Sequence, residues 1–352
     1  DGQHAYFQMI HQGTHLVATE FIGVKTESSD LPLAAEHHRV VLLNMKAQAQ
    51  ALATQQAAAL GTAQLVALET QDFASLSTAS VQALSTGIVS ILSSADIIAL
   101  TTAQANALTS TQTVGLTSTQ AAVLEGADLA KLSTTALSSI TTTAFSAVAT
   151  GDITSLSGTQ MGALTSAQVT ALTTSQAAVL GTTQTVGLVS SQTAGLETAD
   201  LAALTTTAFA ALTTGVVSTL SGAQMGALTT DQVTALTTAQ AAALTATQAG
   251  GITTVQTAAL ESGDLNKLST SAFEAIATGV IAGLSAAQVG ALTSAQVTAL
   301  TTAQAAALTS TQTAGLTTSQ AAGLESGDLN KLTTDAFAAI EPSVTAKLSS
   351  TQ

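Results

Sequence analysis

The stretch Leu300-Thr301-Thr302-Ala303-Gln304-Ala305-Ala306-Ala307-Leu308 is one eight-residue unit that closes on the leucine of the next unit. Stepping by eight from Leu52 to Leu348 meets Leu, Ile or Val at all 38 positions, and 33 of them are Leu. No insertion or deletion interrupts this register. Residues 53–352 are therefore one array of octads, in which each unit gains its stability from the neighbours stacked on it.

The length of the octad limits the architectures that it can form. Eight residues are about 2.2 turns of α-helix, so successive leucines on one long helix would rotate by about 80° and form no stripe. A coiled coil is excluded as well, because its repeat is seven residues. Two architectures remain. The octads form a solenoid of short helices, or they form a β-solenoid, in which an even repeat keeps every leucine on one face of a strand.

The order of residues within the octad favours short helices. In the octad that starts at Leu164, Thr165 stands at the N-cap and Gln168 three residues later, which is the spacing of a capping box. Leu164 and Val169 then occupy the positions of a hydrophobic staple. The same pattern recurs at Thr101/Gln104, Thr173/Gln176, Thr237/Gln240 and Thr301/Gln304. The β-solenoid stays the alternative, because Thr and Val suit strands.

A longer period lies above the octad. Acidic octads begin at Glu69, Glu125, Glu197, Glu261 and Glu325, and successive members of this series are seven, nine, eight and eight octads apart. Phenylalanines recur at intervals of eight octads, at Phe145, Phe209, Phe273 and Phe337. Eight octads therefore make a superrepeat.

The acidic octads invite a comparison of two interpretations. In the octad of Glu261, Asp264 replaces the usual Gln, and a carboxylate there complements the positive end of a helix. A calcium site or an acid–base pair of Glu261 with Asp264 is the alternative, but neither a D-x-D-x-D loop nor a calcium-binding nonapeptide is present. We expect no metal site. We expect the phenylalanines to fill the core where the octad pattern loosens.

Composition excludes several classes of function. Aromatic residues are 2% and charged residues 8% of the chain, and the formal net charge of −14 argues against nucleic acid or an anionic membrane as a partner. The absence of cysteine excludes disulfides and thiolate metal sites. Although the mean hydropathy is +0.43, Thr, Ser or Gln interrupts every octad, so we expect no insertion into a membrane.

The first 52 residues differ from the array. All five histidines, the only tyrosine and the only arginine lie in residues 1–39. The patterns predict a helix over 4–10, a strand over 16–22, a turn over 28–32 and a helix over 34–52. Two domains are thus expected: a small α/β segment over 1–52 and an octad solenoid over 53–352. Because Asp1 is not an initiator methionine, we expect the chain to be part of a longer protein.

These residues carry a resemblance to a known family. The segment Asp1-Gly2-Gln3-His4-Ala5-Tyr6-Phe7-Gln8-Met9-Ile10-His11-Gln12-Gly13-Thr14 resembles a segment of glucose-6-phosphate isomerases, a family of glycolysis and gluconeogenesis. The strand at Val17 to Gly23 and the helix with His37 and His38 continue the resemblance to about Leu52. The match covers roughly a tenth of the length of a family member.

The resemblance implies a role for His4. In the family the matching histidine assists opening of the sugar ring by proton transfer, work that suits an imidazole with a pKa near neutrality. Without the resemblance, a capping or packing role for His4 would be preferred. His11 is expected to be structural, and His15, His37 and His38 to be solvated. No cofactor and no metal are expected.

Other parts of the family's active site cannot be located in the chain. The resemblance also implies a glutamate that moves the proton, supporting lysine and arginine, a phosphate loop, and a homodimer in which the histidine is lent to the neighbouring subunit. We therefore expect hexose phosphate to bind only if the rest of an isomerase is supplied, and the chain alone to be inactive. The cytoplasm is then the expected location.

A second interpretation concerns the array itself. Its Leu-Thr-x-x-Gln octads loosely resemble repeats of large bacterial surface or secreted proteins, where they serve as spacers or adhesive stalks. On this interpretation the isomerase segment is a relic or an assembly artefact. The array then lies at the cell surface or is secreted, and it associates with itself or contacts surfaces.

Overall fold

A computed structural model describes residues 69–352 of the chain. The elements predicted for residues 1–52, the domain boundary at residue 52 and His4 lie outside the described residues and stay predictions. Everything that follows concerns the octads from Glu69 onward.

Each octad from Glu69 to Leu348 forms its own short helix, and no strand occurs in residues 69–352. The solenoid of short helices is therefore confirmed for this part, and the β-solenoid alternative is not supported. The α-helices are α5 (Thr70–Ser75), α6 (Thr78–Ala83), α7 (Thr86–Val89), α8 (Ser94–Ile98), α9 (Thr102–Ala107), α10 (Ser110–Thr113), α11 (Ser118–Ala121), α12 (Gly126–Leu129), α13 (Thr134–Ser139), α14 (Thr142–Ser146), α15 (Gly158–Ala163), α16 (Ser166–Thr170), α17 (Thr174–Ala178), α18 (Thr182–Thr185), α19 (Thr198–Ala203), α20 (Thr206–Ala210), α21 (Thr214–Val217), α22 (Gly222–Ala227), α23 (Thr230–Thr234), α24 (Thr238–Ala243), α25 (Ala246–Ala249), α26 (Ser262–Leu265), α27 (Thr270–Glu274), α28 (Thr278–Ala282), α29 (Ala286–Gly290), α30 (Ser294–Thr298), α31 (Thr302–Ala306), α32 (Ser310–Ala314), α33 (Ser326–Leu329), α34 (Thr334–Ala338) and α35 (Pro342–Thr345). Four octads form 3-10 helices instead: η1 (Asp152–Ser155), η2 (Ser190–Gly195), η3 (Thr257–Ala259) and η4 (Ala321–Gly323).

The capping boxes predicted from the sequence start these helices. In α16, Thr165 Oγ1 accepts the N–H of Gln168 at 3.1 Å, and the N–H of Thr165 donates to Gln168 Oε1 at 3.0 Å. The other four predicted boxes are present as well. They satisfy N–H groups that a helix start otherwise leaves without partners. The leucine of the next octad ends a helix, as Leu164 does after α15 with an extended ψ of 143°.

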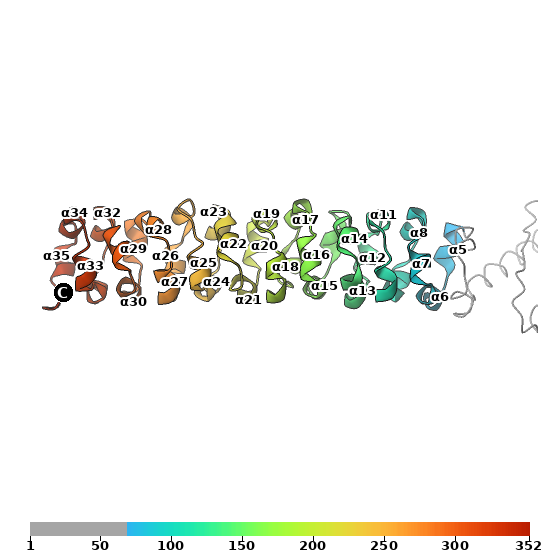
Figure 1. The fold of residues 1–352 in the computed structure, drawn as a ribbon, viewed down its shortest axis with the longest axis horizontal. Helices are drawn as coiled ribbons and strands as arrows, with labels where there is room; N and C mark the ends of the chain where they lie inside the picture. Colours follow the sequence, from blue (N-terminus) through green and yellow to red (C-terminus); the bar gives the residue numbers. More distant parts are fainter. Residues whose placement is uncertain (1–68) are drawn as a thin grey trace, which may run out of the picture. The chain divides into compact units, whose positions relative to one another are not determined.

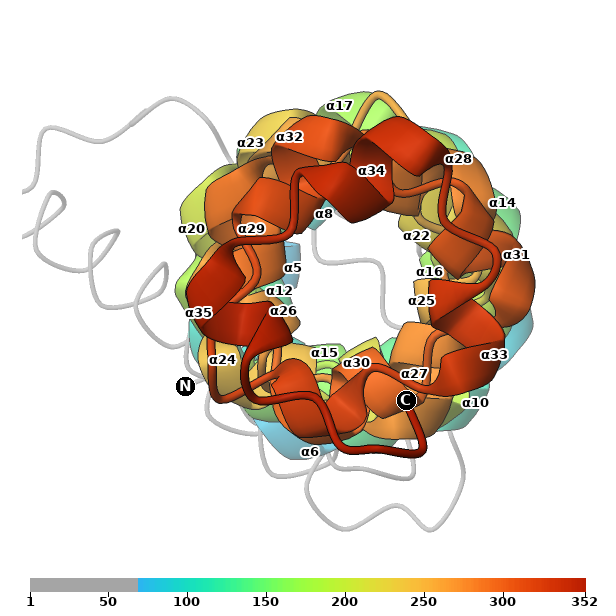
Figure 2. The same cartoon turned by 90° about the vertical axis from the view of Figure 1, so that its left-hand side faces the viewer.

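The helices wind around a common axis. Figure 1 shows them following one another along the long axis of the described part, and Figure 2, a view along this axis, shows them as a ring. Each helix packs on the helix three octads further along the chain, for example α6 on α9, α10 on α13 and α16 on η2. The main tertiary interface is thus formed by helices that are three octads apart in sequence.

Glutamine at the fifth octad position joins successive turns. Gln232 is 1% exposed. Its Oε1 accepts the N–H of Thr229 at 3.0 Å, and its Nε2 donates to the carbonyls of Leu201 at 2.8 Å and Leu204 at 2.9 Å. Every glutamine at this position from Gln104 to Gln352 donates in the same way to the residue 28 positions earlier. One turn of the solenoid therefore takes three and a half octads.

The core lies inside the ring of helices and is continuous. The octad leucines and most apolar residues at the fifth and sixth positions form one hydrophobic cluster that extends from Phe73 to Val344. Phe145, Phe209 and Phe273 are fully buried. Each follows an alanine that replaces the usual glutamine, so their predicted role in filling the core is confirmed. Phe337 differs because it is 48% exposed. It lies in the last described turn, where no later turn covers it.

Glycines permit the closest approach between turns. A Cβ at Gly251 would overlap the backbone of Gly222, and the same contact occurs eight octads earlier between Gly187 and Gly158. None of the described glycines has a positive φ. Glycine is therefore required at these positions by space between two backbones and not by its own backbone conformation.

The turn-to-turn role of glutamine predicts a difference between two substitutions. Gln232→Glu keeps an oxygen for the cap but removes both donated bonds and buries a charge, so we expect a loss of roughly 1–3 kcal/mol or more in the free energy of unfolding. Thr229→Ala removes only the cap hydroxyl and should cost about 1 kcal/mol. Chemical denaturation followed by circular dichroism measures both. Equal losses would show that the bonds between turns contribute little.

The glycine contact predicts that one added methyl group is harmful at one site and harmless at another. Gly251→Ala should lower the melting temperature, because the new Cβ meets backbone atoms of Gly222 that cannot move aside. Gly263→Ala is the matched control. Nothing lies within 4 Å of a Cβ at Gly263, and alanine is the better helix former, so this variant should melt at the wild-type temperature or above. A similar loss in both variants would contradict the packing explanation.

Candidate functional site at the acidic octads

The catalytic residue expected from the sequence, His4, lies outside the described residues. Within residues 69–352 the groups with unusual chemistry are the acidic octads. All five begin a helix with a glutamate at the N-cap, and four of them, in helices α12, α19, α26 and α33, also bury an aspartate. They are the candidate site in the described part of the chain.

The two acids of each octad lie in different environments. The N-cap glutamates are exposed, whereas the aspartates three residues later are almost completely buried. The exposed fractions of the aspartates are 2% for Asp128, 4% for Asp200, 5% for Asp264 and 6% for Asp328. These aspartates occupy the octad position at which glutamine elsewhere joins two turns. The predicted place of Asp264 in the first turn of its helix is confirmed, but its burial was not predicted.

The buried carboxyl groups are incompletely hydrogen-bonded. One oxygen, Oδ2, has no partner in Asp128, Asp200 and Asp264. In Asp200 the other oxygen, Oδ1, accepts a hydrogen bond from Thr174 Oγ1 at 2.8 Å. Aspartate is one methylene shorter than glutamine, and its ionised form has no hydrogen to donate. It therefore cannot replace the bonds from Gln Nε2 to the carbonyls of the preceding turn.

Burial changes the acidity of these groups. Removal from water, with a smaller contribution from the Glu125 carboxylate, raises the pKa of Asp128 to about 6. Burial also raises the pKa of Asp264 and Asp328, and the neighbouring N-cap glutamates add to the effect. For Asp200, burial raises the pKa, while the hydrogen bond from Thr174 acts in the opposite direction.

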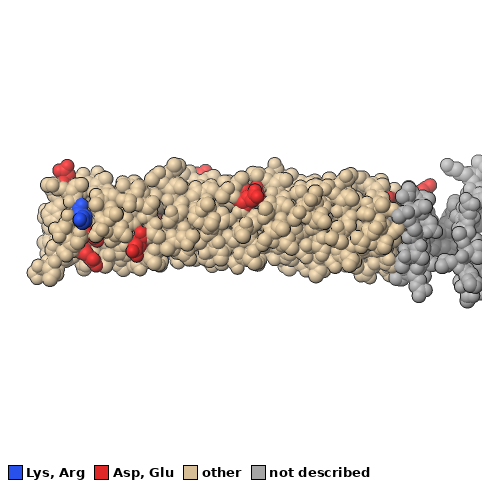
Figure 3. Space-filling model, viewed as in Figure 1, with Lys and Arg blue, Asp and Glu red and all other residues tan. Residues whose placement is uncertain are grey.

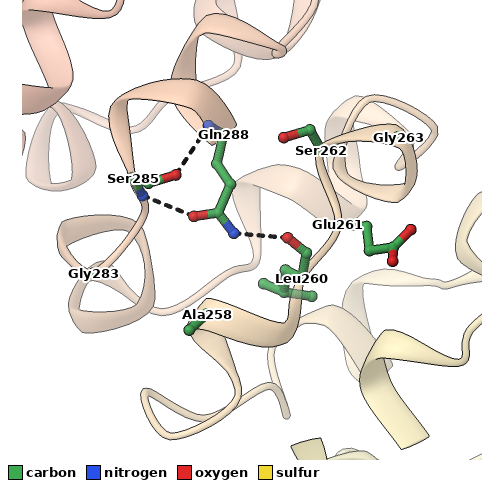
Figure 4. Close-up of a pocket in the computed structure, with 8 residues that line it drawn as sticks. All are labelled: Ala258, Leu260, Glu261, Ser262, Gly263, Gly283, Ser285 and Gln288. Atoms are coloured by element: carbon green, nitrogen blue, oxygen red, sulfur yellow. Dashed lines mark hydrogen bonds between the residues drawn. The ribbon is translucent and has the colours of Figure 1, made fainter. Parts of the chain in front are cut away.

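A shallow pocket of about 560 Å³ lies beside the acidic octad of Glu261. Figure 4 shows Ser285 and Gln288 across from Leu260 and Glu261. The amide of Gln288 is already used, because Oε1 accepts the N–H of Ser285 at 2.7 Å and Nε2 donates to the carbonyl of Leu260 at 2.7 Å. A corresponding pocket of about 510 Å³ lies eight octads earlier beside Glu197. The pockets are thus a repeated feature of the seam between turns.

The polar groups around these pockets do not make a catalytic set. Ser285 and Gln288 bond to each other, which leaves the exposed Glu261 and the half-buried Ser262 as the groups open to a ligand. In residues 69–352, no group of three or more His, Cys, Asp or Glu side chains could hold a metal ion. Figure 3 shows charged side chains scattered over the visible face of the described part. The described site therefore consists of buried aspartates with raised pKa values, and it contains no nucleophile with a base beside it.

Family models match two parts of the chain. Residues 1–113 match phosphoglucose isomerase, and residues 193–238 and 257–302 match the ALTTAQ repeat. The first match extends past Leu52, where the resemblance was expected to end, and includes helices α5 to α10, which are octad helices of the same kind as the later ones. The resemblance of the first residues to the isomerase family is thus confirmed, and the octads match a known repeat family. The resemblance of the octads to repeats of bacterial surface proteins stays a prediction.

Individual relatives cover only a small part of the chain. The glucose-6-phosphate isomerase of Albidiferax ferrireducens is 55% identical over 56 residues, which are 16% of this chain and 10% of that protein. The glucose-6-phosphate isomerase of Novosphingobium aromaticivorans is 52% identical over 52 residues, 15% of this chain and 10% of that protein. The chain spans about a tenth of the length of these relatives. No solved structure matches it.

The missing bonds at the acidic octads predict a stabilising substitution. Asp264→Gln should raise the melting temperature at neutral pH, because the longer amide can donate to the carbonyl of the preceding turn and removes a buried carboxylate. Asp231→Gln is the control, since Asp231 is exposed and adjoins a glutamine that already joins the turns. A melting temperature that falls in the first variant would mean that the carboxylate is itself favourable at this position.

Proposed function

We propose that the chain is a fragment of a glucose-6-phosphate isomerase joined to a non-catalytic octad array, and that this chain alone does not interconvert glucose 6-phosphate and fructose 6-phosphate. The observation that carries the proposal is the use of the octad side chains. The leucines and sixth-position residues are buried in one core, and the glutamine amides bond to two turns at once. The recurring apolar and glutamine side chains of each octad therefore stabilise the solenoid.

The isomerase part of the proposal rests on His4. The residues around it match the family, and the histidine in that position is expected to transfer a proton during opening of the sugar ring. The glutamate, the phosphate loop and the supporting lysine and arginine that the family uses could not be located in the sequence. One acid–base group without the rest of the pocket has neither the bound substrate nor the partner that the isomerisation needs. Hexose phosphate is proposed as a ligand only when the remaining isomerase segments are supplied.

A coupled assay tests this proposal. Purified chain is supplied with fructose 6-phosphate, and formation of glucose 6-phosphate is followed beside a His4→Ala variant and an intact isomerase. We expect no turnover above the variant. Turnover by the chain that disappears in His4→Ala would overturn the proposal and would show that the chain holds a working site.

The alternative is a spacer or adhesive repeat at a bacterial surface, with the isomerase segment as a relic or an assembly artefact. The regularity of the array favours it, because the ALTTAQ match itself recurs within the chain eight octads later. In residues 69–352, no helix is long and apolar enough to cross a membrane. Contacts of the array with other copies or with surfaces belong to this alternative.

Location separates the two proposals. An antibody against the array should label the cytoplasmic fraction if the isomerase segment determines where the chain works. Labelling of intact cells, abolished by brief surface proteolysis, would favour the spacer at the surface instead.

A further inference from the structure

The acidic octads are among the octads that interrupt the glutamine hydrogen bonds between turns, and they are the ones that bury a carboxyl group there. Nineteen glutamines bond to the carbonyl 28 residues earlier, and the four buried aspartates occupy the same octad position. By this register, the carbonyls opposite the four aspartates belong to Leu100, Leu172, Leu236 and Leu300, and alanine or valine at the fifth position, as at Ala272 and Val280, leaves further carbonyls without a glutamine. The interruption is thus a missing donor between two turns that otherwise pack in the usual way.

Few charges surround the aspartates. Helix α26 packs on α24 and α29, α19 packs on α17 and α22, and α33 packs on α31, and none of these neighbours carries a charged residue. Helix α12 packs on α9, which has no charge, and on η1, which contributes Asp152. The Asp152 Oδ1 accepts the N–H of Gly126 at 3.0 Å.

The acidic octads themselves carry few charged groups besides the aspartates. Each octad has its exposed N-cap glutamate, and exposed lysines follow three of the aspartates at Lys131, Lys267 and Lys331. The N-cap glutamate of its own octad is the charged group that raises the pKa of each aspartate further. The aspartates are therefore held beside like charge, in a buried position where the neutral acid is favoured.

A protonated aspartic acid has what the ionised form lacks. Its O–H can donate to a carbonyl, while a carboxylate can only accept. The register places a leucine carbonyl of the preceding turn at this position, and a carbonyl repels a carboxylate and accepts from an acid. At Asp200 the hydroxyl of Thr174 from that turn also donates to Oδ1. A proton from solvent thus converts an unfavourable pair of acceptors into a donor and an acceptor.

We propose that the four acidic octads are proton-sensitive joints in the solenoid. A protonated aspartic acid donates its hydrogen to the leucine carbonyl of the preceding turn, as glutamine does elsewhere, and an ionised one leaves that carbonyl without a donor. Because the aspartic side chain is shorter than glutamine, the bond forms only when the two turns draw together, so protonation also tightens the joint.

The direction of the pH dependence follows from proton binding. The pKa of Asp128 is about 6 in the folded chain against an ordinary value of 3.8, so the folded state binds more protons than the unfolded state between these values. The stabilisation is complete below the ordinary pKa and is lost as the pH rises through about 6. The chain should therefore be more stable in mild acid than at neutrality.

Thermal unfolding of the full chain tests the proposal. Melting temperatures are measured by circular dichroism from about pH 7.5 to about pH 4.5, for wild type and for the variant with Asp128, Asp200, Asp264 and Asp328 all replaced by Asn. We expect the wild-type melting temperature to rise by several degrees towards mild acid. The fourfold variant should remain constant over the same range, because its amides donate at every pH.

Two controls make the result specific. Asp231→Asn removes an exposed carboxylate on α23 and should keep the wild-type pH dependence. The exposed N-cap glutamates are present in every variant, so their own titration cancels in the comparison. If the fourfold variant does not fold, the single variant Asp128→Asn should lose part of the wild-type dependence.

A direct titration gives an independent readout. Carboxyl carbon resonances of the aspartates, followed by NMR across the same pH range, should show that the buried Asp128 titrates above the ordinary value of 3.8. A wild-type melting temperature that stays constant or falls towards mild acid, with a parallel fourfold variant, would overturn the proposal. Ordinary titration of all aspartates would overturn it as well.

Discussion

A single side-chain amide, buried between two turns, holds the octads together. The oxygen of the glutamine caps the helix of its own octad, and the nitrogen binds two carbonyls of the turn before it, as in Gln232 with Thr229, Leu201 and Leu204. A primary amide suits this place because it carries an acceptor and two donors on one planar group. Burial between backbones then costs little, since every polar atom of the group is paired.

Much of this architecture could be predicted from the octad itself. The capping box of Thr165 and Gln168 and the staple of Leu164 and Val169 are local patterns, and local patterns can be recognised in sequence. The size of the solenoid turn could not be predicted. It follows from the way short helices pack across three to four octads, and the partner carbonyls are backbone groups that every residue possesses. The bonding of glutamine to the preceding turn is therefore visible in the sequence only as the recurrence of glutamine at the fifth octad position.

The candidate site, too, could be predicted from the sequence only in part. The sequence correctly predicted that Asp264 stands in the first turn of a helix, but it gave no sign that the turn-to-turn interface buries this carboxyl group. Once glutamine is known to be buried at the fifth position, the replacement by Asp becomes the signal that sequence alone lacked. His4 is a different case. Its proposed role comes from the match of a short segment to a family, and His4 itself lies outside the described residues.

The mismatch between the turn of three and a half octads and the superrepeat of eight has a mechanical consequence. Two turns take seven octads, so the acidic octads of Glu261 and Glu325 are each displaced by one octad around the axis relative to the acidic octad one superrepeat earlier. These acidic octads therefore do not line up on one side of the solenoid. If they act as the proposed joints, loosening them gives the solenoid no single preferred direction of bending.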